Sequence, residues 1–267
     1  MKKKLAVIGC GALGRIMCTN VRKLLDDHYE IVGLFDLNNE AGMALANDIG
    51  SVFVDKIEDL YAKKPDIMVE IAGVPAAKAY GEYILRNVSD LIVVSVGSLA
   101  DDDFKNKLYK AAEETGHRLY IPSGAVGGFD LMQIFALMGA KKVSIESTKA
   151  PRSLNGAPYL EGRELSETEE ELVFAGNVKD AIKGFPKNVN VAVATALASD
   201  FADTEVRIRS VPGKKENSHA ITLEGENMKA EVVITSTPDP VNPKSSVSAA
   251  WSVVALLKNL ASPVMFY

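Results

Sequence analysis

The amino terminus constrains this chain most strongly, because a short apolar run there leads directly into three closely spaced glycines. Residues 4–8 predict a buried strand, and they are followed by Gly9-Cys10-Gly11-Ala12-Leu13-Gly14 and then by a helical pattern. In this order of elements the first glycine permits a tight turn, the second lets a pyrophosphate approach the backbone, and the third lets the helix pack close to the strand. The N–H groups that begin the helix would then face the phosphates. The stretch therefore predicts a dinucleotide site, which includes Ala12 and Leu13.

An acidic residue follows the second predicted strand. Residues 30–35 are mostly apolar and lead into Asp36, which comes about 20 residues after the glycines, where a carboxylate accepts hydrogen bonds from the adenosine ribose. Glycines also mark ordinary turns, so the motif alone would fit a plain strand-turn-helix. The combination of strand, glycines, helix and acid favours the nucleotide site. Asp36 would repel a ribose 2′-phosphate, which favours NAD, whereas the neutral Asn38 and Asn39 leave NADP open as the cofactor.

Continuous apolar runs alternate with helical stretches through residues 1–122, as is typical of parallel strands covered on both faces. We therefore expect a doubly wound α/β Rossmann domain there. Its strands are predicted at residues 4–8, 30–35, 51–54, 67–73, 91–97 and 118–122, and its later helices at 40–49, 76–87 and 101–115. Ligands of such sheets bind beyond the carboxyl ends of the strands. The expected cofactor-binding residues at those ends are Ala72, Gly73, Ser95 and Val96, although small residues also close tight turns without any ligand.

From residue 141 the pattern changes to an alternation of apolar and polar residues. This period of two indicates a mixed or antiparallel sheet with one solvent-exposed face. We expect an α+β substrate and dimerisation domain over residues 123–244, with strands at 142–147, 171–175, 205–210, 219–224 and 229–235 and helices at 177–183 and 188–201. The remaining residues, 245–267, contain an apolar helical stretch that is expected to pack back on the first domain.

Composition excludes several classes of protein. The net charge of −5 and the pI near 5.4 argue against a nucleic-acid-binding surface. No apolar run approaches the length that spans a membrane, and the amino terminus lacks the pattern of a signal peptide. We interpret Cys10 and Cys18 as reduced thiols of a cytoplasmic protein, with a redox pair as the less usual alternative. No cluster of histidine, cysteine and carboxylate residues has the spacing of metal ligands.

A dinucleotide domain followed by an α+β domain implies that a substrate is held between them, so polar groups of the second half are candidates for the chemistry. The small residues 123–128 form either a ligand-binding loop or a hinge. Asn188 fits a helix N-cap, whereas Lys187 beside it suits an anionic substrate. His28 and His117 are expected in solvated connections. On position alone His219, which begins a strand after a polar turn, is slightly more consistent with a surface residue than with a catalytic one.

The whole chain resembles the L-aspartate dehydrogenase family. The resemblance rests on VIGCGALG at residues 7–14, IPSGAVGGFD at 121–130, PKNVNVA at 186–192 and DPVNP at 239–243, of which the first is generic to Rossmann domains and the second and third are much more specific. It implies that Ala125 and Asn190 contact the nicotinamide cofactor and that His219 is the catalytic histidine. It also implies an NAD- or NADP-dependent conversion of L-aspartate to iminoaspartate or oxaloacetate plus ammonia, or the reverse amination, in a homodimer whose product feeds pyridine-nucleotide synthesis.

The expected mechanism needs a proton acceptor and an anion-binding group. We expect His219 to take a proton from the substrate amine and then to activate water for attack on the imine, a role suited to a group that titrates near neutrality. Lys187 is expected to bind a substrate carboxylate, with the backbone of residues 123–125 as a second donor. Two alternatives remain. One is another two-domain reductase, like homoserine dehydrogenase or dihydrodipicolinate reductase, and the other is a non-catalytic NAD(H) sensor, which needs Asp36 but no such pair of side chains.

Overall fold

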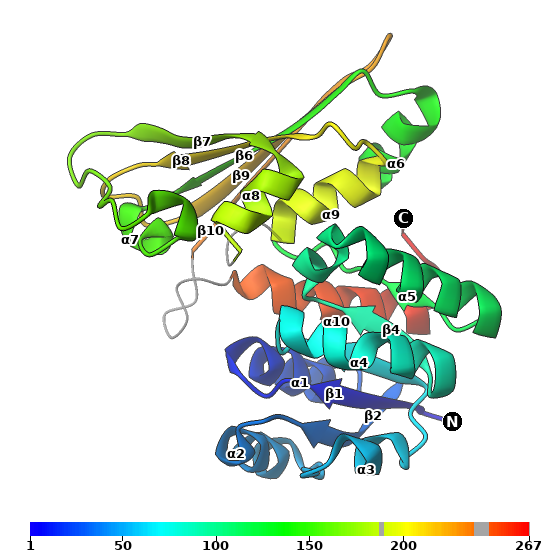
Figure 1. Ribbon diagram of the computed structural model, residues 1–267. Coiled ribbons are helices and arrows are strands. Elements are labelled where there is room, and N and C mark those ends of the chain that lie inside the picture. Colours follow the sequence, from blue (N-terminus) through cyan, green and yellow to red (C-terminus); the bar gives the residue numbers. More distant parts are fainter. Residues whose placement is uncertain (187–189, 238–245, 267) are drawn as a thin grey trace. The chain divides into compact units, whose positions relative to one another are not determined.

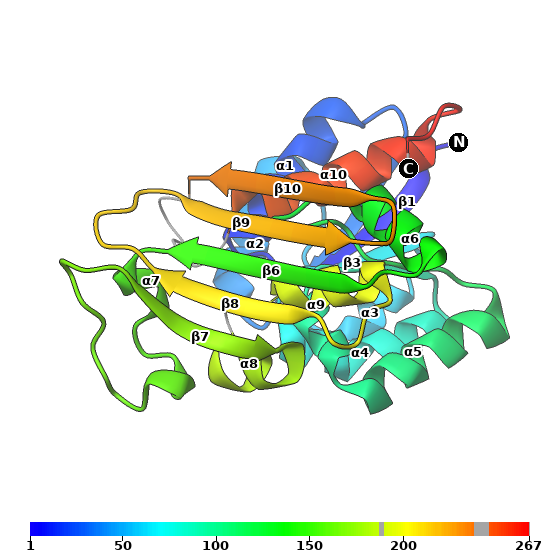
Figure 2. The same cartoon turned by 90° about the horizontal axis from the view of Figure 1, so that it is seen from above.

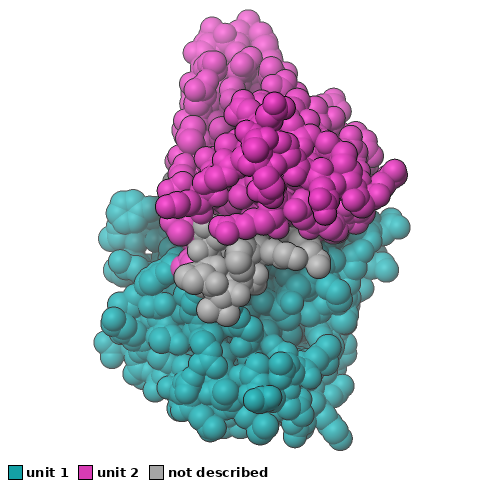
Figure 3. Space-filling view, turned by 90° about the vertical axis from the view of Figure 1, so that its left-hand side faces the viewer, with its two compact units in different colours: residues 1–122, 249–266 teal, residues 123–248, 267 magenta. Residues whose placement is uncertain are grey.

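The chain forms two compact units (Figure 3). The computed structural model describes residues 1–186, 190–237 and 246–266. Unit 1 comprises Met1–Pro122 together with Ala249–Phe266, and unit 2 comprises Ser123–Ser248. Within the described ranges, no helix has the length and apolar character that crossing a membrane requires.

Unit 1 is built on a five-stranded parallel sheet with the strand order β2-β1-β3-β4-β5 (Figure 1). The prediction of a doubly wound parallel sheet is confirmed. Its strands are β1 (Lys3–Ile8), β2 (Tyr29–Phe35), β3 (Ile67–Glu70), β4 (Asp90–Val93) and β5 (Leu119–Tyr120). The helices are α1 (Ala12–Leu24), α2 (Asn39–Ile49), α3 (Ile57–Tyr61), α4 (Val74–Asn87), α5 (Asp102–Thr115) and α10 (Val247–Ala261), with a 3₁₀ turn η1 (Val96–Ala100).

The last helix of the chain completes the core of unit 1. Ala250, Val253, Val254 and Leu257 of α10 are buried in the same cluster as Leu5 of β1. Burying a valine or leucine side chain contributes roughly 1.5–3 kcal/mol, so α10 is an integral part of this core. The hydroxyl of Tyr29, at the start of β2, donates a hydrogen bond of 2.8 Å to the carbonyl of Leu257.

The prediction of a strand at residues 51–54 is wrong. This segment makes a single bridge, between Phe53 and Leu34 of β2, in which the Leu34 N–H donates to Val52 O and the Val54 N–H donates to Leu34 O. The segment therefore adds one pair of backbone bonds to the sheet edge. The other predicted strands of unit 1 exist. Strands β1 and β2 end at the predicted residues, whereas β3, β4 and β5 end before the predicted residues 73, 97 and 122.

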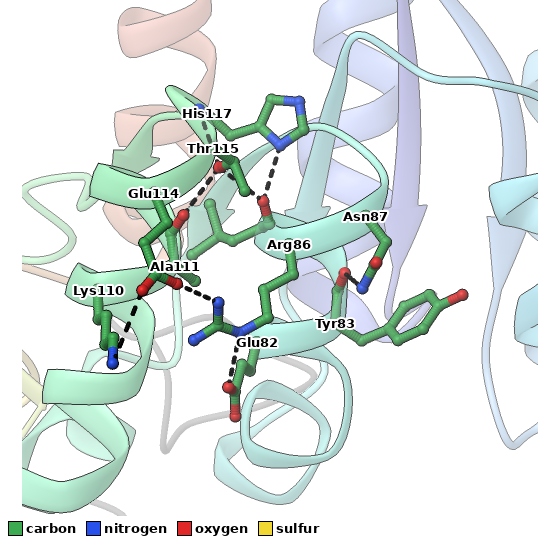
Figure 4. A network of polar contacts seen from close by, with 10 residues as sticks. Glu82, Tyr83, Arg86, Asn87, Lys110, Ala111, Glu114, Thr115 and His117 are labelled. Atoms are coloured by element: carbon green, nitrogen blue, oxygen red, sulfur yellow. Dashed lines mark hydrogen bonds and ion pairs between the residues drawn. The ribbon is translucent and has the colours of Figure 1, made fainter.

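Helices α4 and α5 are joined by a polar network (Figure 4). Arg86 of α4 donates to Glu82 on its own helix and to Glu114 of α5, and ion pairs at such a solvent-exposed position stabilise the fold only weakly. His117 lies at the same end, with Nδ1 2.7 Å from the carbonyl oxygen of Leu85. His117 is thus half-buried and hydrogen-bonded, in contrast to the solvated connection that was expected, whereas His28 is exposed.

Unit 2 carries a mixed five-stranded sheet with the order β10-β9-β6-β8-β7 (Figure 2), which confirms the second predicted sheet. Strands β6 and β8 run parallel, and the other neighbouring pairs are antiparallel. The strands are β6 (Lys142–Lys149), β7 (Glu171–Asn177), β8 (Glu205–Ser210), β9 (Asn217–Glu224) and β10 (Lys229–Ser236). Helices α6 (Phe129–Met138), α8 (Val178–Gly184) and α9 (Asn190–Ser199) lie on one face of the sheet, and the short turns α7 (Pro151–Leu154) and η2 (Pro158–Leu160) follow β6 (Figure 1).

Candidate active-site residues

The glycine turn of unit 1 has the geometry that a bound pyrophosphate requires. Gly9 has φ +114°, and a Cβ added there would lie 2.7 Å from the backbone N of Ala72. A Cβ on Gly14 would lie 2.0 Å from the carbonyl oxygen of Gly9, so the start of α1 packs directly on the turn. A Cβ on Gly11, by contrast, would meet nothing within 4 Å. The first and third glycines are therefore needed for packing, and the second leaves space open.

The amino end of α1 suits an anion. Gly11 is the N-cap, no side chain caps the helix, and the first turn contains no acidic residue. Ala12 and Leu13 are the first two helical residues, and both are half-buried. The positive end of the helix dipole and the first N–H groups are therefore not neutralised by a local carboxylate.

Asp36 lies just beyond the carboxyl end of β2 and closes the glycine turn. Its Oδ2 accepts a hydrogen bond of 2.6 Å from the Cys10 N–H, and its Oδ1 accepts one of 2.8 Å from the Asn38 N–H. Each carboxylate oxygen has a second lone pair, which is the acceptor that a ribose hydroxyl needs. The Asn38 side chain caps α2 by accepting from the Ala41 N–H at 3.1 Å. The residues at this edge of unit 1 thus fit a dinucleotide.

Both cysteines of unit 1 are free and buried. Burial, with the Asp36 carboxylate as a second cause, raises the pKa of the Cys10 thiol to about 12, and burial raises the pKa of the Cys18 thiol as well. Thiolate is the nucleophilic and metal-binding form of cysteine. These thiols are therefore protonated and poorly reactive near neutral pH.

Glu70, the last residue of β3, organises the loops that were expected to contact the cofactor. Its side chain is 1% exposed. Its Oε1 accepts hydrogen bonds from the backbone N–H groups of Ala72 (2.9 Å) and Gly73 (2.8 Å). The same oxygen accepts from Ser95 Oγ at 2.8 Å, and Oε2 accepts from the Ser95 N–H at 3.2 Å. Burial raises the pKa of this carboxyl, and the four donors act in the opposite direction.

The residues of these loops consequently have fewer backbone N–H donors available to a cofactor than their positions at the strand ends suggested. The N–H groups of Ala72, Gly73 and Ser95 are bonded to Glu70, and the N–H of Val96 donates to Val94 O at 2.9 Å. What these residues can present to a ligand is carbonyl oxygen and small apolar surface. The sequence signal for Glu70 was a lone acid at the end of an otherwise apolar strand, directly before small residues.

In unit 2 the candidate chemistry lies on the inner face of the sheet, which the helices cover. Along β6 the inner positions are Val143 and Ile145 and then the polar Ser147 and Lys149. Ser147 is paired with His219 of β9, and Lys149 is paired with Ser210 of β8. We refer to the buried polar residues at this end of the sheet as the polar cluster: Ser147, Lys149, Ser210, Asn217 and His219.

His219 is buried in the polar cluster, with 3% of its surface exposed. Its Nδ1 lies 2.9 Å from Ser147 Oγ. Burial, and secondly the positive charge of Lys149, lower the pKa of the imidazole to about 3. The surface location that position alone favoured is therefore wrong, and so is the expectation that this group titrates near neutrality. His219 is a neutral imidazole held in a fixed orientation.

Lys149 is the site residue that sequence reasoning missed. It is 5% exposed, and burial lowers the pKa of its ammonium group to about 8. The expected strand ended at residue 147, whereas β6 continues through Lys149. Extending the alternation by two residues would have placed this lysine on the inner face beside Ser147.

The other expected residues are separate from the polar cluster or outside the described residues. Lys187 and the Asn188 N-cap fall in the undescribed range 187–189, and the 239–243 motif falls in 238–245. Asn190 is the first residue of α9 and is exposed. Ala125 is half-buried in the turn that follows Gly124 (φ +67°), where the Val126 N–H donates to Ser123 O at 3.2 Å.

Unit 1 has a parallel sheet with an open glycine turn, and unit 2 has a mixed sheet that buries a histidine. Together these features define a two-domain dinucleotide-dependent dehydrogenase. Residues 9–122 match the family model described as homoserine dehydrogenase, NAD binding domain, and residues 130–260 match the one described as aspartate dehydrogenase, C-terminal. An L-aspartate dehydrogenase of Methanococcus maripaludis is 36% identical to this chain, over 98% of each chain. The chain belongs to the L-aspartate dehydrogenase family, and its first unit is an NAD-binding domain.

Solved structures agree with this assignment. The crystal structure of an aspartate dehydrogenase from Thermotoga maritima matches with a TM-score of 0.78 at 26% identity, and the match covers 100% of both chains. A homoserine dehydrogenase from Thiobacillus denitrificans matches with a TM-score of 0.64 at 13% identity, over 98% of this chain and 73% of that one. The second likeness concerns the fold alone.

Proposed function

We propose that this protein catalyses the NAD(P)-dependent interconversion of L-aspartate with iminoaspartate, which water converts to oxaloacetate and ammonia. One observation carries the proposal: a chain that matches L-aspartate dehydrogenases over 98% of its length buries a neutral histidine, His219, within hydrogen-bond distance of Ser147. An oriented neutral imidazole is the proton acceptor that oxidation of an amine needs.

His219 is the proposed acid/base group. Because Nδ1 is held at 2.9 Å by Ser147 Oγ, we assign proton exchange to Nε2. His219 takes a proton from the substrate ammonium, since only the uncharged amine can become an imine, and it then helps a water molecule to attack that imine. Bound nicotinamide supplies the hydride acceptor. Overall, L-aspartate, water and the oxidised cofactor yield oxaloacetate, ammonium, the reduced cofactor and one proton.

We infer that the nucleotide binds at the glycine turn of unit 1, with the phosphates at Gly11 and the amino end of α1 and with Asp36 on the adenosine ribose. Asp36 favours NAD over NADP because its carboxylate would repel a 2′-phosphate. Ala72, Gly73, Ser95 and Val96 line this site through carbonyl oxygens and small side chains. Ala125 and Asn190 are assigned to the nicotinamide end on the family resemblance, and Lys187 remains a proposed carboxylate ligand on the same ground.

We further propose a homodimer formed through the outer face of the unit 2 sheet. Helices α6, α8 and α9 lie on the opposite face, and no described element of unit 2 covers the outer one (Figures 1 and 2). This face carries the Arg209–Glu146 ion pair, at 3.0 Å, and the exposed Val233. Measurement of the molar mass by light scattering tests the dimer.

The activity test is oxidation of NADH, and separately of NADPH, with oxaloacetate plus ammonium. Pyruvate, 2-oxoglutarate and aspartate semialdehyde serve as competing substrates, and the last of these tests the homoserine dehydrogenase alternative. His219→Ala should lower kcat by about 10²–10⁴-fold, as loss of a general acid/base does, with the Kd for NADH unchanged. His28→Ala, which removes an exposed histidine, is the matched control. The proposal fails if oxaloacetate plus ammonium supports no turnover with either nucleotide, or if His219→Ala retains the wild-type rate.

A further inference from the structure

A charged side chain lies beside His219 on the inner face of unit 2, and nothing in the proposed mechanism yet uses it. We propose that Lys149 binds one carboxylate of the dicarboxylic substrate next to His219, so that bound substrate controls the charge that the imidazole experiences. This inference rests on the proposed function only for the identity of the substrate and for the acid/base role of His219.

The sheet register brings these groups together. Ser147 is directly opposite His219, and Lys149 is the next inner-face residue along β6. Adjacent strands lie about 4.8 Å apart, and a step of two residues along a strand is about 6.6 Å. A lysine side chain readily spans such a distance, so its ammonium group and the imidazole act on one another, as the effect of Lys149 on the pKa of His219 indicates.

Ser210 provides an independent sign that the polar cluster accommodates a ligand. It is the β8 partner of Lys149, and it is fully buried. Its Oγ is a buried polar atom without a hydrogen-bond partner among the described residues. A buried hydroxyl left without a partner costs about 1–3 kcal/mol. A carboxylate bound at Lys149 would supply the acceptor that this hydroxyl needs.

Lys149 is the charged residue that faces His219 from the described elements packed around it. The inner positions of β8 are Val206, Ile208 and Ser210, and those of β10 include Val232 and Ile234. Helix α9 has no charged residue, and the charged side chains of α6 and α8 are exposed: Asp130, Lys179, Asp180 and Lys183. The electrostatic state of His219 therefore depends chiefly on Lys149 and on what binds to it.

The proximity of Lys149 to His219 has a consequence for proton transfer. Burial and the Lys149 charge hold the pKa of His219 near 3, which keeps the imidazole neutral and able to accept a proton. A proton once accepted would be repelled by the positive charge of Lys149. A carboxylate bound at Lys149 cancels that repulsion and favours the imidazolium. Substrate binding thus raises the basicity of His219 at the step when it must hold the proton of the amine.

Histidine NMR tests this directly, because the chain has three histidines. In protein labelled at histidine, the pKa of each imidazole is measured with and without ethane-1,2-disulfonate, a dianion of similar length to the substrate that stays ionised at the low pH where His219 titrates. We expect the disulfonate to raise the pKa of His219 by at least about one unit and to leave His28 and His117 unchanged, with His219→Gln used to assign the signal. In Lys149→Met the effect of the disulfonate should disappear. If the disulfonate binds the wild type without moving the His219 titration, the inference is wrong.

Kinetics provide a second readout and a conservative variant. Lys149→Met should raise the KM for aspartate by about 10- to 100-fold, as loss of a charged hydrogen-bond partner does, whereas the control Lys183→Met removes an exposed lysine of α8. Burial lowers the pKa of Lys149 to about 8, so KM should rise above that pH in the wild type. In Lys149→Arg, which stays protonated, this rise should move to higher pH.

The two proposals fail in different ways. If the wild type has no activity with oxaloacetate plus ammonium but the disulfonate still shifts the His219 titration, the proposed function is wrong and the anion site at Lys149 stands. If the wild type is active and Lys149→Met keeps the wild-type KM and pH profile, the carboxylate site is wrong. Should Lys149→Met fail to fold, the pH profile of Lys149→Arg and the wild-type NMR titration decide the question.

Discussion

Replacing Glu70 should both destabilise unit 1 and weaken nucleotide binding, because one buried carboxylate orders two loops at the edge of the sheet. In Glu70→Ala the Ser95 N–H and hydroxyl and the Gly73 N–H lose their acceptor, whereas exposed Ala72 can bond to water. Each buried donor without a partner costs about 1–3 kcal/mol, and relief of the desolvated carboxylate offsets part of the sum. We expect a loss of about 2–4 kcal/mol in the free energy of unfolding.

Glu70→Gln removes the negative charge of this side chain but keeps its size and shape. The amide oxygen can still accept from the donors that Oε1 serves, but the amide nitrogen would face the Ser95 N–H, which now lies 3.2 Å from Oε2. Two donors then oppose one another, so we expect a loss of about 1–2 kcal/mol. Glu113→Gln, on the exposed surface of α5, is the control for loss of a carboxylate.

The assays are urea unfolding followed by circular dichroism and NADH binding followed by fluorescence. Two units need not unfold together, so the transition of unit 1 is identified as the one that NADH shifts. Disorder of the two loops should raise the Kd for NADH about tenfold or more, since tenfold corresponds to about 1.4 kcal/mol. If Glu70→Ala unfolds at the wild-type urea concentration and binds NADH with the wild-type Kd, then Glu70 orders neither loop.

Two further predictions concern the glycine turn and His219. Gly14→Ala should destabilise unit 1 strongly, because the new Cβ would lie 2.0 Å from the carbonyl oxygen of Gly9. In Gly11→Ala the new Cβ has no close neighbour, so this variant should fold normally but bind NADH more weakly. Thermal unfolding and NADH titration distinguish the two variants. The pKa of His219 is about 3 in the folded protein and has its ordinary value of 6.5 in the unfolded chain, so the unfolded chain binds the proton first as the pH falls. Stability that is present above pH 6.5 is therefore lost as the pH falls toward 3. Urea unfolding at several pH values should show this loss, about 1.4 kcal/mol per unit of pKa separation at most, and His219→Gln should remove it; equal slopes in the two proteins would contradict the assigned burial.

The sequence predicted the fold well where periodicity and local chemistry agree. The apolar strand, the glycines and Asp36 are consecutive signals of one supersecondary unit, and the alternation from residue 141 is a period that only strands produce. The segment 51–54 was overpredicted because a short apolar run does not reveal that its neighbour in space offers a single bridge, at Leu34. The extent of this pairing is set by tertiary structure, which a short local sequence pattern does not reveal.

The candidate site was predictable in part, for a different reason. His219 and Ser147 are 72 residues apart in sequence, and only the register of β6 against β9 makes them neighbours. Without that register, a histidine after a polar turn resembles a surface residue. Glu70 was missed because the predicted strand ran on to residue 73, and Lys149 was missed because the predicted strand ended at residue 147. Charged residues are also rarely buried, and burial at these two positions depends on helices that come from elsewhere in the chain.

Glu70 and Lys149 are each the last residue of a strand, yet the structure gives them different roles. Around Glu70, burial raises the pKa of the carboxyl and four donors from its own unit oppose that shift, and through these hydrogen bonds the side chain holds two loops. For Lys149 burial is the cause of the pKa shift, and its charge in turn lowers the pKa of a neighbouring histidine. Burial makes the ammonium charge of Lys149 costly, and a carboxylate bound there would offset part of that cost. A dicarboxylate such as succinate should therefore stabilise unit 2 against unfolding at neutral pH, and this stabilisation should disappear in Lys149→Met.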